Sequence, residues 1–364
     1  MRQRMTWLDY ARVFAIISIS SNHAITRAFY GYPTPYDAYL ASPVVGCVFR
    51  AIIFIFSRIG VPFFLMITGA LLLNKPISTG KDIALFYKHN LGRLIITCEI
   101  WLFISFWFIS YFTEPEILHQ SLFYIIMRCL GSLLFINQVA PASMWYIPMI
   151  LCLYLLIPFV NIIVNKYSSN LMLISCGIVF LSAMLIPNIN SICELVGSGI
   201  NLDFGLSQGN LFSYYMLYIL AGYCVSNNCF HKFSTLVLSI LAFLTFALSC
   251  VYQGWEYTIP GADKTYYNFV PMALSSVFLF ALFHRVADKL KERKAITYLS
   301  KISFGIYFVH IYIMMCMLLI HPLAFHPVLR FLLLEILSVG VSIAVISALS
   351  RIPILKKYVF MIKD

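Results

Sequence analysis

The stretch that decides the fold is Trp7-Leu-Asp-Tyr-Ala-Arg12-Val-Phe-Ala-Ile-Ile-Ser-Ile-Ser-Ser-Asn-His23, an apolar run with two ionisable side chains inside it. Arg12 and His23 are eleven residues apart. On an α-helix this is three turns plus about 20°, so both side chains leave the same face, about 16 Å apart along the axis. An arginine at the centre of a lipid-facing helix costs about 3 kcal/mol. We therefore expect this face to line a bundle interior or a watery cavity.

The rest of the chain has the composition of a membrane protein. Of its 364 residues, 61% are hydrophobic and 11% are charged, and the mean hydropathy is +0.88. The apolar residues form repeated blocks of about 18 to 25, the length that an α-helix needs to cross a bilayer core of about 30 Å. We predict an all-α polytopic integral membrane protein. The first run has no signal-peptide cleavage site, so it is expected to stay in the mature protein.

Ten membrane spans are predicted, and together they form a single transmembrane domain over residues 1–364. The spans are approximately 7–28, 44–73, 85–113, 143–165, 171–187, 210–226, 234–254, 268–288, 304–321 and 329–349. The second and third runs exceed the bilayer thickness, so they must tilt, kink at Pro62 or extend into the headgroups. The segment 121–135 is apolar but too short to span, which is typical of a re-entrant or interfacial helix.

The distribution of lysine and arginine predicts the orientation. An even number of spans places both termini on one side. The termini and the loops on that side hold eighteen lysines and arginines, against five on the other side. The positive-inside rule then predicts cytoplasmic termini. The net charge of +11 follows from this topology and attracts anionic membrane lipids, without indicating a nucleic-acid partner. The scattered cysteines lack zinc-ligand spacing, so no metal site is predicted.

The first helix enters from the cytoplasm in this topology, with Arg12 about one and a half turns inside and His23 in the outer third of the membrane. A guanidinium is a permanent, planar set of donors suited to phosphate, and a neutral imidazole can take a proton. Asp9 is placed to orient the guanidinium. In the structural alternative, Arg12 pairs with Asp9 near the inner headgroups and His23 is a hydrogen-bonding residue between helices.

The Leu8-Asp9-x-x-Arg12 opening followed by x10-His23 resembles the first-helix signature of membrane acyltransferase family 3, integral-membrane proteins that acetylate bacterial surface polysaccharides and related acceptors. Further segments resemble the family in chain order: Ser57-Arg58-Ile-Gly-Val-Pro-Phe-Phe-Leu-Met-Ile-Thr-Gly69, Met144-Trp145-Tyr146-Ile-Pro148, Tyr154-Leu-Leu-Ile-Pro158, Tyr218-Ile-Leu-Ala-Gly-Tyr223 and Ser303-Phe-Gly-Ile-Tyr307-Phe-Val-His310. The likeness covers nearly the whole chain. It is greatest to the short members without a fused hydrolase-like domain, the type of the enterobacterial common antigen O-acetyltransferases.

The resemblance implies cytoplasmic acetyl-CoA as the acyl donor. Its phosphates are expected at an inner basic mouth made by Arg12, Arg93, Lys88 and Arg58, where the local field concentrates anions. The family's Arg-x-x-Arg motif at the start of the third helix is incomplete here, because Asn90 stands in place of its first arginine. Of that motif, only Arg93 carries over.

The pantetheine arm is expected to run along the first-helix face to His23. This histidine is the predicted general base, which takes the proton of the acceptor hydroxyl as it attacks the thioester. A covalent acetyl-histidine is a second route. Either route links a cytoplasmic donor to an outward acceptor without moving CoA across the membrane.

Other residues are candidates for supporting roles. Glu99 is a possible partner for an arginine of the donor site, and Glu335 for a histidine or an acceptor hydroxyl. The resemblance implies that Tyr307 and His310 line the cavity. Trp145 and Tyr146 fit either the site or the interfacial aromatic belt. Aromatic residues of the outer loops fit sugar stacking or the same belt: Tyr30, Tyr32, Tyr36, Tyr39, Trp255, Tyr257, Tyr266 and Tyr267.

The predicted function is an O-acetyltransferase of a bacterial inner membrane that moves acetyl from acetyl-CoA to a hydroxyl of an extracytoplasmic or membrane-linked glycan. Its partners are then a glycan or lipid-linked sugar acceptor and the membrane lipids. The alternative is a transporter or flippase for an anionic solute, in which Arg12, Arg58 and Glu99 bind the solute while His23 and Glu335 relay protons. Transporters often contain paired halves with interrupted helices, and the sequence shows no such symmetry.

Overall fold

The computed structural model describes residues 5–75, 77–136, 142–166, 169–202, 213–262, 265–320 and 325–362, and every regular element in these ranges is a helix. The α-helices are α1 (Thr6–Ala28), α2 (Pro35–Ala41), α3 (Arg50–Arg58), α4 (Gly60–Leu72), α5 (Gly80–Phe86), α6 (Gly92–Phe112), α7 (Leu122–Leu133), α8 (Tyr146–Lys166), α9 (Ser169–Phe180), α10 (Ile186–Leu195), α11 (Ser213–Ser226), α12 (Thr235–Tyr257), α13 (Val270–Arg285), α14 (Lys294–Ile320) and α15 (Pro327–Leu349). The shorter helical segments are η1 (Val44–Phe49), η2 (Tyr87–Leu91), η3 (Pro115–His119), η4 (Ala142–Trp145), η5 (Leu181–Leu185), η8 (Ala287–Lys289) and η9 (Leu355–Val359). The predicted all-α class is confirmed.

Within the described residues, seven helical segments are long and apolar enough to cross a membrane. They are Val44–Leu72, Gly80–Phe112, Tyr146–Lys166, Ile174–Leu195, Thr235–Tyr257, Lys294–Ile320 and Pro327–Leu349. Helix α1 has a spanning length of 23 residues but is more polar, and α11 and α13 are shorter apolar helices. Helices thus cover all ten predicted spans, except that residues 210–212 and 321 lie outside the described part. The number of crossings and the cytoplasmic termini stay predictions.

Three helices extend beyond the predicted membrane spans, whose boundaries stay predictions. Helix α14 begins at Lys294 instead of 304, and α10 continues to Leu195, where a loop was predicted from Asn188. Both added stretches are amphipathic, so an apolar run does not reveal them. Helix α5 begins at Gly80 instead of 85 because Thr79 and Asp82 form a capping box: each accepts a hydrogen bond from the other's backbone N–H.

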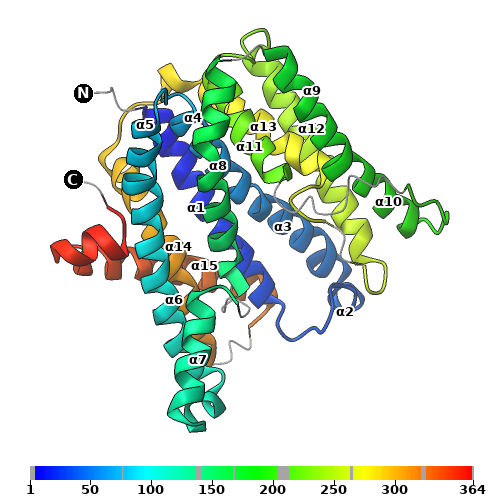
Figure 1. Cartoon of the computed structure of the whole chain (residues 1–364). Helices are drawn as coiled ribbons and strands as arrows, with labels where there is room; N and C mark the ends of the chain where they lie inside the picture. The colour runs from blue at the N-terminus through cyan, green and yellow to red at the C-terminus, as the bar shows by residue number, and fades with distance from the viewer. Residues whose placement is uncertain are drawn as a thin grey trace.

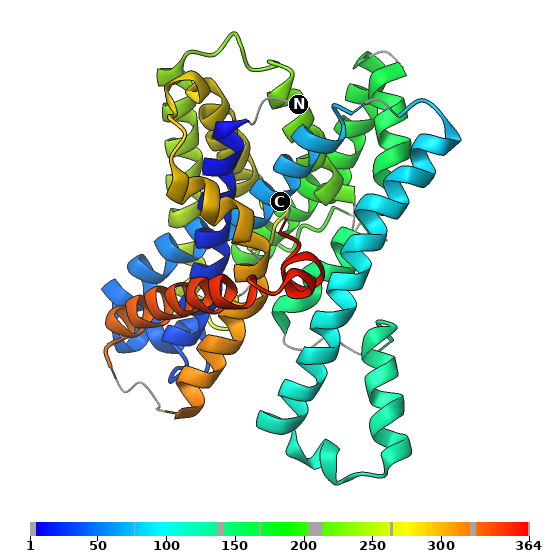
Figure 2. The ribbon, with the colours of Figure 1, turned by 90° about the vertical axis from the view of Figure 1, so that its left-hand side faces the viewer.

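Helix α1 lies at the centre of the bundle although it is not among its most apolar helices. It packs against α3, α4, α13, α14 and α15, and Figure 2 shows α15 crossing in front of α1 and α14. Polar side chains of α1 such as Ser18 and Ser20 are fully buried. Helix α12, on the side of the bundle away from α6 in Figure 1, instead exposes Leu236, Phe243 and Val251 by 67 to 70%. The polar helix is therefore shielded, and the apolar one presents a face suited to lipid.

The second predicted span breaks between α3 and α4. The break lies at Ile59, three residues before Pro62. Proline has no N–H to donate, and its ring clashes with the carbonyl group four residues earlier, which here belongs to Arg58. The kink predicted at Pro62 is thus a break one turn earlier, and Arg58 becomes the last residue of α3.

The break is held against the middle of α1. The Ser18 hydroxyl donates to the carbonyl oxygens of Phe56 and Ser57, at 2.8 and 3.1 Å, and the Phe56 carbonyl also accepts from the Ile59 N–H. Gly60 permits this approach, because a Cβ at that position would lie 2.6 Å from the carbonyl oxygen of Ala15. These contacts fix the level of the end of α3 along α1.

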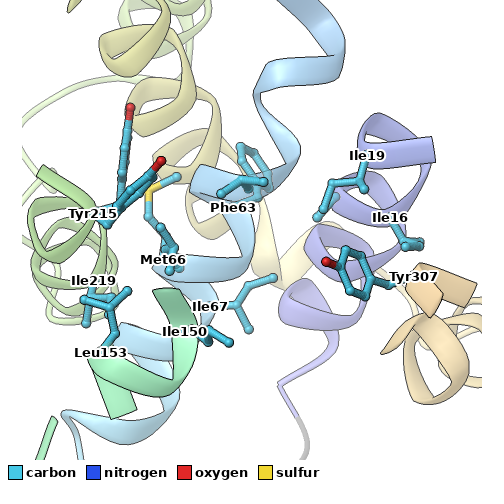
Figure 3. Packing of buried hydrophobic residues seen from close by; sticks show 14 of the residues in the cluster. Ile16, Ile19, Phe63, Met66, Ile67, Ile150, Leu153, Tyr215, Ile219 and Tyr307 are labelled. Carbon is cyan, nitrogen blue, oxygen red and sulfur yellow. The ribbon is translucent and has the colours of Figure 1, made fainter. Parts of the chain in front are cut away.

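Helices α4 and α11 cross in backbone contact. A Cβ at Gly69 would overlap the carbonyl oxygen of Ile219, and one at Gly222 would overlap that of Met66. Small residues let membrane helices approach closely and so increase their dispersion attraction. Figure 3 shows the core around this crossing, where apolar side chains of α1, α4, α8, α11 and α14 meet.

Candidate active site

Helices α1 and α14 lie side by side, run in the same direction and make polar contacts at two levels. At the first level, Asp9 and Arg12 contact Ser300. At the second, His23 contacts His310. Ten or eleven residues separate the two levels on either helix, about 15 Å at 1.5 Å per residue. We call the first group, Asp9, Arg12 and Ser300, the Arg12 cluster.

In the Arg12 cluster, the positive charge is compensated within the protein. The Ser300 hydroxyl donates to Asp9 Oδ1 at 2.6 Å, and the same oxygen lies 3.6 Å from Arg12 Nη1. The carboxylate is buried, with 4% of its side chain exposed, whereas 30% of the Arg12 side chain is exposed. Asp9 and Ser300 therefore orient a guanidinium that a ligand can still reach.

At the second level, two histidine rings lie with their centroids 5.3 Å apart. His310 is fully buried, and its Nδ1 lies 2.7 Å from the carbonyl oxygen of Ile306. A carbonyl can only accept, so Nδ1 carries the proton and, in a neutral ring, Nε2 is left as an acceptor. Nε2 is also buried, and no described residue hydrogen-bonds to it. The histidine pair therefore offers an acceptor nitrogen with no partner in this part of the chain.

Cations and one carboxylate surround the pair. Arg27 and Arg58 both lie within electrostatic range of His23, and Arg27 Nη1 donates to the backbone carbonyl of His23 at 3.3 Å. The carboxylate of Glu335 on α15 accepts a hydrogen bond from Ser20, one turn before His23, at 2.8 Å. Its other oxygen, Oε1, is buried without a hydrogen-bond partner in the described ranges. Glu335 therefore reaches the site through a serine, and no hydrogen bond joins it to a histidine of the described ranges.

An arc of aromatic rings connects His310 to Arg58. His310 lies 6.4 Å from Tyr307, and Tyr307 lies 5.7 Å from Tyr146, all between ring centroids. Trp145, which precedes Tyr146 in the chain, has its ring centroid 5.3 Å from that of Tyr267. The Arg58 guanidinium carbon lies 5.1 Å from the centroid of the Tyr267 ring. We call these residues, with His23 and His310, the His23 cluster. The fold thus brings four residues of the predicted site, Trp145, Tyr146, Tyr307 and His310, to one place.

Tyr267 is a member of this cluster that the sequence did not reveal. It reads as an outer-loop aromatic residue, yet it is only 5% exposed, and its carbonyl accepts a hydrogen bond from Tyr218 at 2.6 Å. The one sequence signal is Pro271, four residues later, since proline favours the first turn of a helix. That signal places Tyr267 just before α13, which begins at Val270.

Arg58 lies beyond the level of Arg12, toward His23, because the neighbouring Ser57 hydroxyl donates to Asn22 Oδ1 at 3.2 Å. It ends α3 opposite Ser18, which is six residues beyond Arg12 on α1, or about 9 Å along the axis. Its predicted grouping with Arg12 stays a prediction, because spacing along one helix carries no information on the level of a residue from another helix.

Arg93 binds the C-terminal segment. Its Nη2 donates to the carbonyl oxygens of Lys357 and Ile362 at 3.1 and 3.4 Å. One and two turns further along α6, Thr97 and Trp101 donate to the next two carbonyls of η9, those of Tyr358 and Val359. This row of donors fastens the segment 355–362 to α6, a contact that the sequence did not predict.

The other two residues of the predicted donor site stand apart. Lys88 is exposed on η2, and Glu99 is half-buried on α6. The arginine partner that the sequence predicts for Glu99 is not found, since no ion pair joins Glu99 to an arginine in the described ranges. Of the predicted basic mouth, Arg12 alone has the geometry of a ligand-binding group at the end of α1.

The fold and this site define an all-α integral membrane protein with histidines and arginines at the centre of its helix bundle. A family model described as an acyltransferase domain matches residues 5–347. The chain therefore belongs to the acyltransferase 3 family and is a membrane acyltransferase, which confirms the resemblance seen in the sequence. A search of curated proteins and a search of solved structures each found no match. The likeness to the enterobacterial common antigen type stays a prediction.

Proposed function

We propose that this acyltransferase is an O-acetyltransferase of a bacterial inner membrane. It moves acetyl from cytoplasmic acetyl-CoA to a hydroxyl of an extracytoplasmic glycan or a lipid-linked sugar. The observation that carries this proposal is the arrangement of two different polar clusters at two levels of the α1 and α14 pair, one around Arg12 and one around His23.

The Arg12 cluster is suited to the donor. A guanidinium recognises phosphate through several N–H groups and a permanent charge. Asp9 and Ser300 hold it in place while part of the side chain stays accessible. The phosphates of CoA bind at this level in our proposal, and the pantetheine arm extends along α1 for the 15 Å or so that separate the two clusters.

The His23 cluster is suited to the transfer step. The hydroxyl oxygen of the acceptor attacks the thioester carbonyl carbon, and His23 takes the hydroxyl proton. The new C–O bond forms, the C–S bond breaks, and protonated His23 returns the proton to the CoA thiolate. Attack by His23 itself, through an acetyl-histidine, is the second route. A histidine peptide that gains an acetyl mass after rapid quenching supports this second route.

The transporter alternative gains no support from the family match. Acyl transfer is what the family model describes, and the buried polar atoms around His23 serve a reaction at that level without substrate crossing the bundle.

Two measurements test the proposal. The purified protein in detergent is expected to bind CoA, and surface glycans of cells that carry the gene are expected to contain an acetyl mass missing from cells without it. His23→Ala should abolish that acetylation, while His119→Ala, at an exposed histidine of η3, should not. A folded protein that binds no CoA, or glycans identical with and without the gene, would contradict the proposal.

A further inference from the structure

We propose that Arg58 is a catalytic residue of the transfer step, whose guanidinium donates to the thioester carbonyl oxygen as that oxygen becomes negative. The inference rests on the proposed function and adds to it a residue that stabilises the oxyanion. Three features of the structure support it: a fixed position, donors without acceptors, and convergence with His23.

The position of Arg58 is fixed by the backbone. It closes α3 at the break before Pro62, and the preceding carbonyl group, that of Ser57, accepts a hydrogen bond from Ser18. Gly60 packs directly against the backbone of α1. A catalytic group needs this kind of support, because donors stabilise a developing charge best when they require no rearrangement.

The guanidinium of Arg58 has aromatic neighbours and no hydrogen-bond acceptor among the described residues. It lies 4.5 Å from the Phe54 ring and 5.1 Å from the Tyr267 ring. Its Nε is buried without a hydrogen-bond partner. Aromatic faces stabilise a cation but leave its N–H groups unused. Burying such donors is costly unless an acceptor arrives, so the site is prepared for a ligand oxygen.

Other arginines of the core are engaged differently. Arg12 contacts Asp9 and Ser300, Arg93 donates to the C-terminal segment, and Arg27 donates to the His23 carbonyl. Arg330 donates to two backbone carbonyls, of Ala28 and Phe325. Unlike these four arginines, Arg58 directs none of its donors at a protein oxygen in the described part of the chain.

Arg58 and His23 act on the same space. The residues next to them are hydrogen-bonded, since the Ser57 hydroxyl of α3 donates to Asn22 Oδ1 of α1 at 3.2 Å, and His310 approaches the His23 ring from α14. Acyl transfer needs a base for the acceptor proton and a donor for the oxyanion of the tetrahedral intermediate. When the intermediate collapses, the negative charge passes from the carbonyl oxygen to the CoA sulfur, which the protonated His23 neutralises. Arg58 stays charged throughout.

The test compares Arg58→Gln and Arg58→Lys with Arg285→Gln, which removes a charge at an exposed arginine of α13. Membranes from cells lacking the gene supply the acceptor glycan, each variant is expressed in them, and acetyl transfer from labelled acetyl-CoA is measured. We expect Arg58→Gln to lower kcat by about 10² to 10³ while KM for acetyl-CoA stays within about threefold. Arg58→Lys should retain about ten times more activity than Arg58→Gln, and Arg285→Gln should stay within about twofold of the wild-type kcat.

The outcomes separate this inference from the function on which it rests. No transfer by wild-type membranes would overturn the proposed function. With an active wild type, a kcat within threefold in Arg58→Gln would overturn the role of Arg58 alone. A weaker affinity for acetyl-CoA or for the glycan, seen as a higher KM with unchanged kcat, would also overturn this role. It would make Arg58 a binding residue. If Arg58→Gln fails to fold by size exclusion, Arg58→Lys decides, with a kcat at least fivefold below wild type expected.

Discussion

The two ends of the α1 and α14 contact share a helix face but treat charge in opposite ways. Around Arg12, the cation meets a buried carboxylate and stays partly exposed. Around His23, the nearby cations have no carboxylate bonded to them among the described residues, and Nε2 of His310 is buried without a partner. A compensated, accessible charge suits reversible binding, because it exists stably without ligand. Uncompensated buried groups suit chemistry, because they gain most when reactants arrive.

The largest effect is expected at the His23 end. Replacing His23 by Ala removes the proposed base, so kcat for acetyl transfer should fall by about 10² to 10⁴. The affinity for CoA, measured by calorimetry on the purified protein, should change by less than about twofold. Undiminished transfer by this variant would show that the base lies elsewhere.

At the other end, Arg12→Gln should separate binding from chemistry. It removes hydrogen bonds from a charged group, each worth about 1.5 to 3 kcal/mol, so KM for acetyl-CoA should rise about 10- to 100-fold. At saturating donor, kcat should stay within about threefold of the wild-type value. A matched control is Lys88→Gln, at the exposed lysine of η2, which should leave KM unchanged. Equal effects of the two variants would contradict the special role of Arg12.

His310→Phe keeps a ring beside His23 but removes both nitrogens. The bond to Ile306 and the free acceptor are lost together. A lost hydrogen bond of about 1 to 1.5 kcal/mol corresponds to a drop of about tenfold in kcat. His310→Gln should recover part of the rate. Full activity in His310→Phe would mean that the pair is only a packing contact.

The smallest effect is expected at Ser18, which supports Arg58 indirectly. Ser18→Ala removes the hydroxyl that donates to the carbonyls of Phe56 and Ser57 at the end of α3, so the free energy of unfolding should fall by about 1 kcal/mol. Thermal unfolding in detergent measures this change. The kcat should fall about two- to threefold, because Arg58 loses its fixed position. A stability loss without any change in kcat would uncouple Ser18 from the site.

Sequence reasoning was strongest where one helix carries the information. The eleven-residue spacing of Arg12 and His23 predicted a shared face, and the structure directs both side chains toward α14. Apolar runs located a helix at every predicted span, and the motif order predicted the family. Helices extend beyond the predicted spans where amphipathic residues continue them, as at Lys294.

Relations between helices were harder to predict. The level of Arg58 depends on the break before Pro62 and on its packing against Ser18, which lies 39 residues from Ser57 in the chain. Tyr267 belongs to a loop that packs against the site. Arg93 donates to a carbonyl of the C-terminal segment, which is more than 260 residues away in the chain. Such contacts need the tertiary fold, because residue type alone does not show which element a side chain will meet.

The division of labour between the two clusters is tested most directly by CoA affinity in two variants. Calorimetry with CoA on purified His23→Ala and Arg12→Gln compares both with the wild type under one set of conditions. We predict a dissociation constant within about twofold of wild type for His23→Ala, and at least about tenfold higher for Arg12→Gln. Wild-type affinity in Arg12→Gln, or an equal loss in His23→Ala, would contradict the assignment of binding to one end of α1 and chemistry to the other.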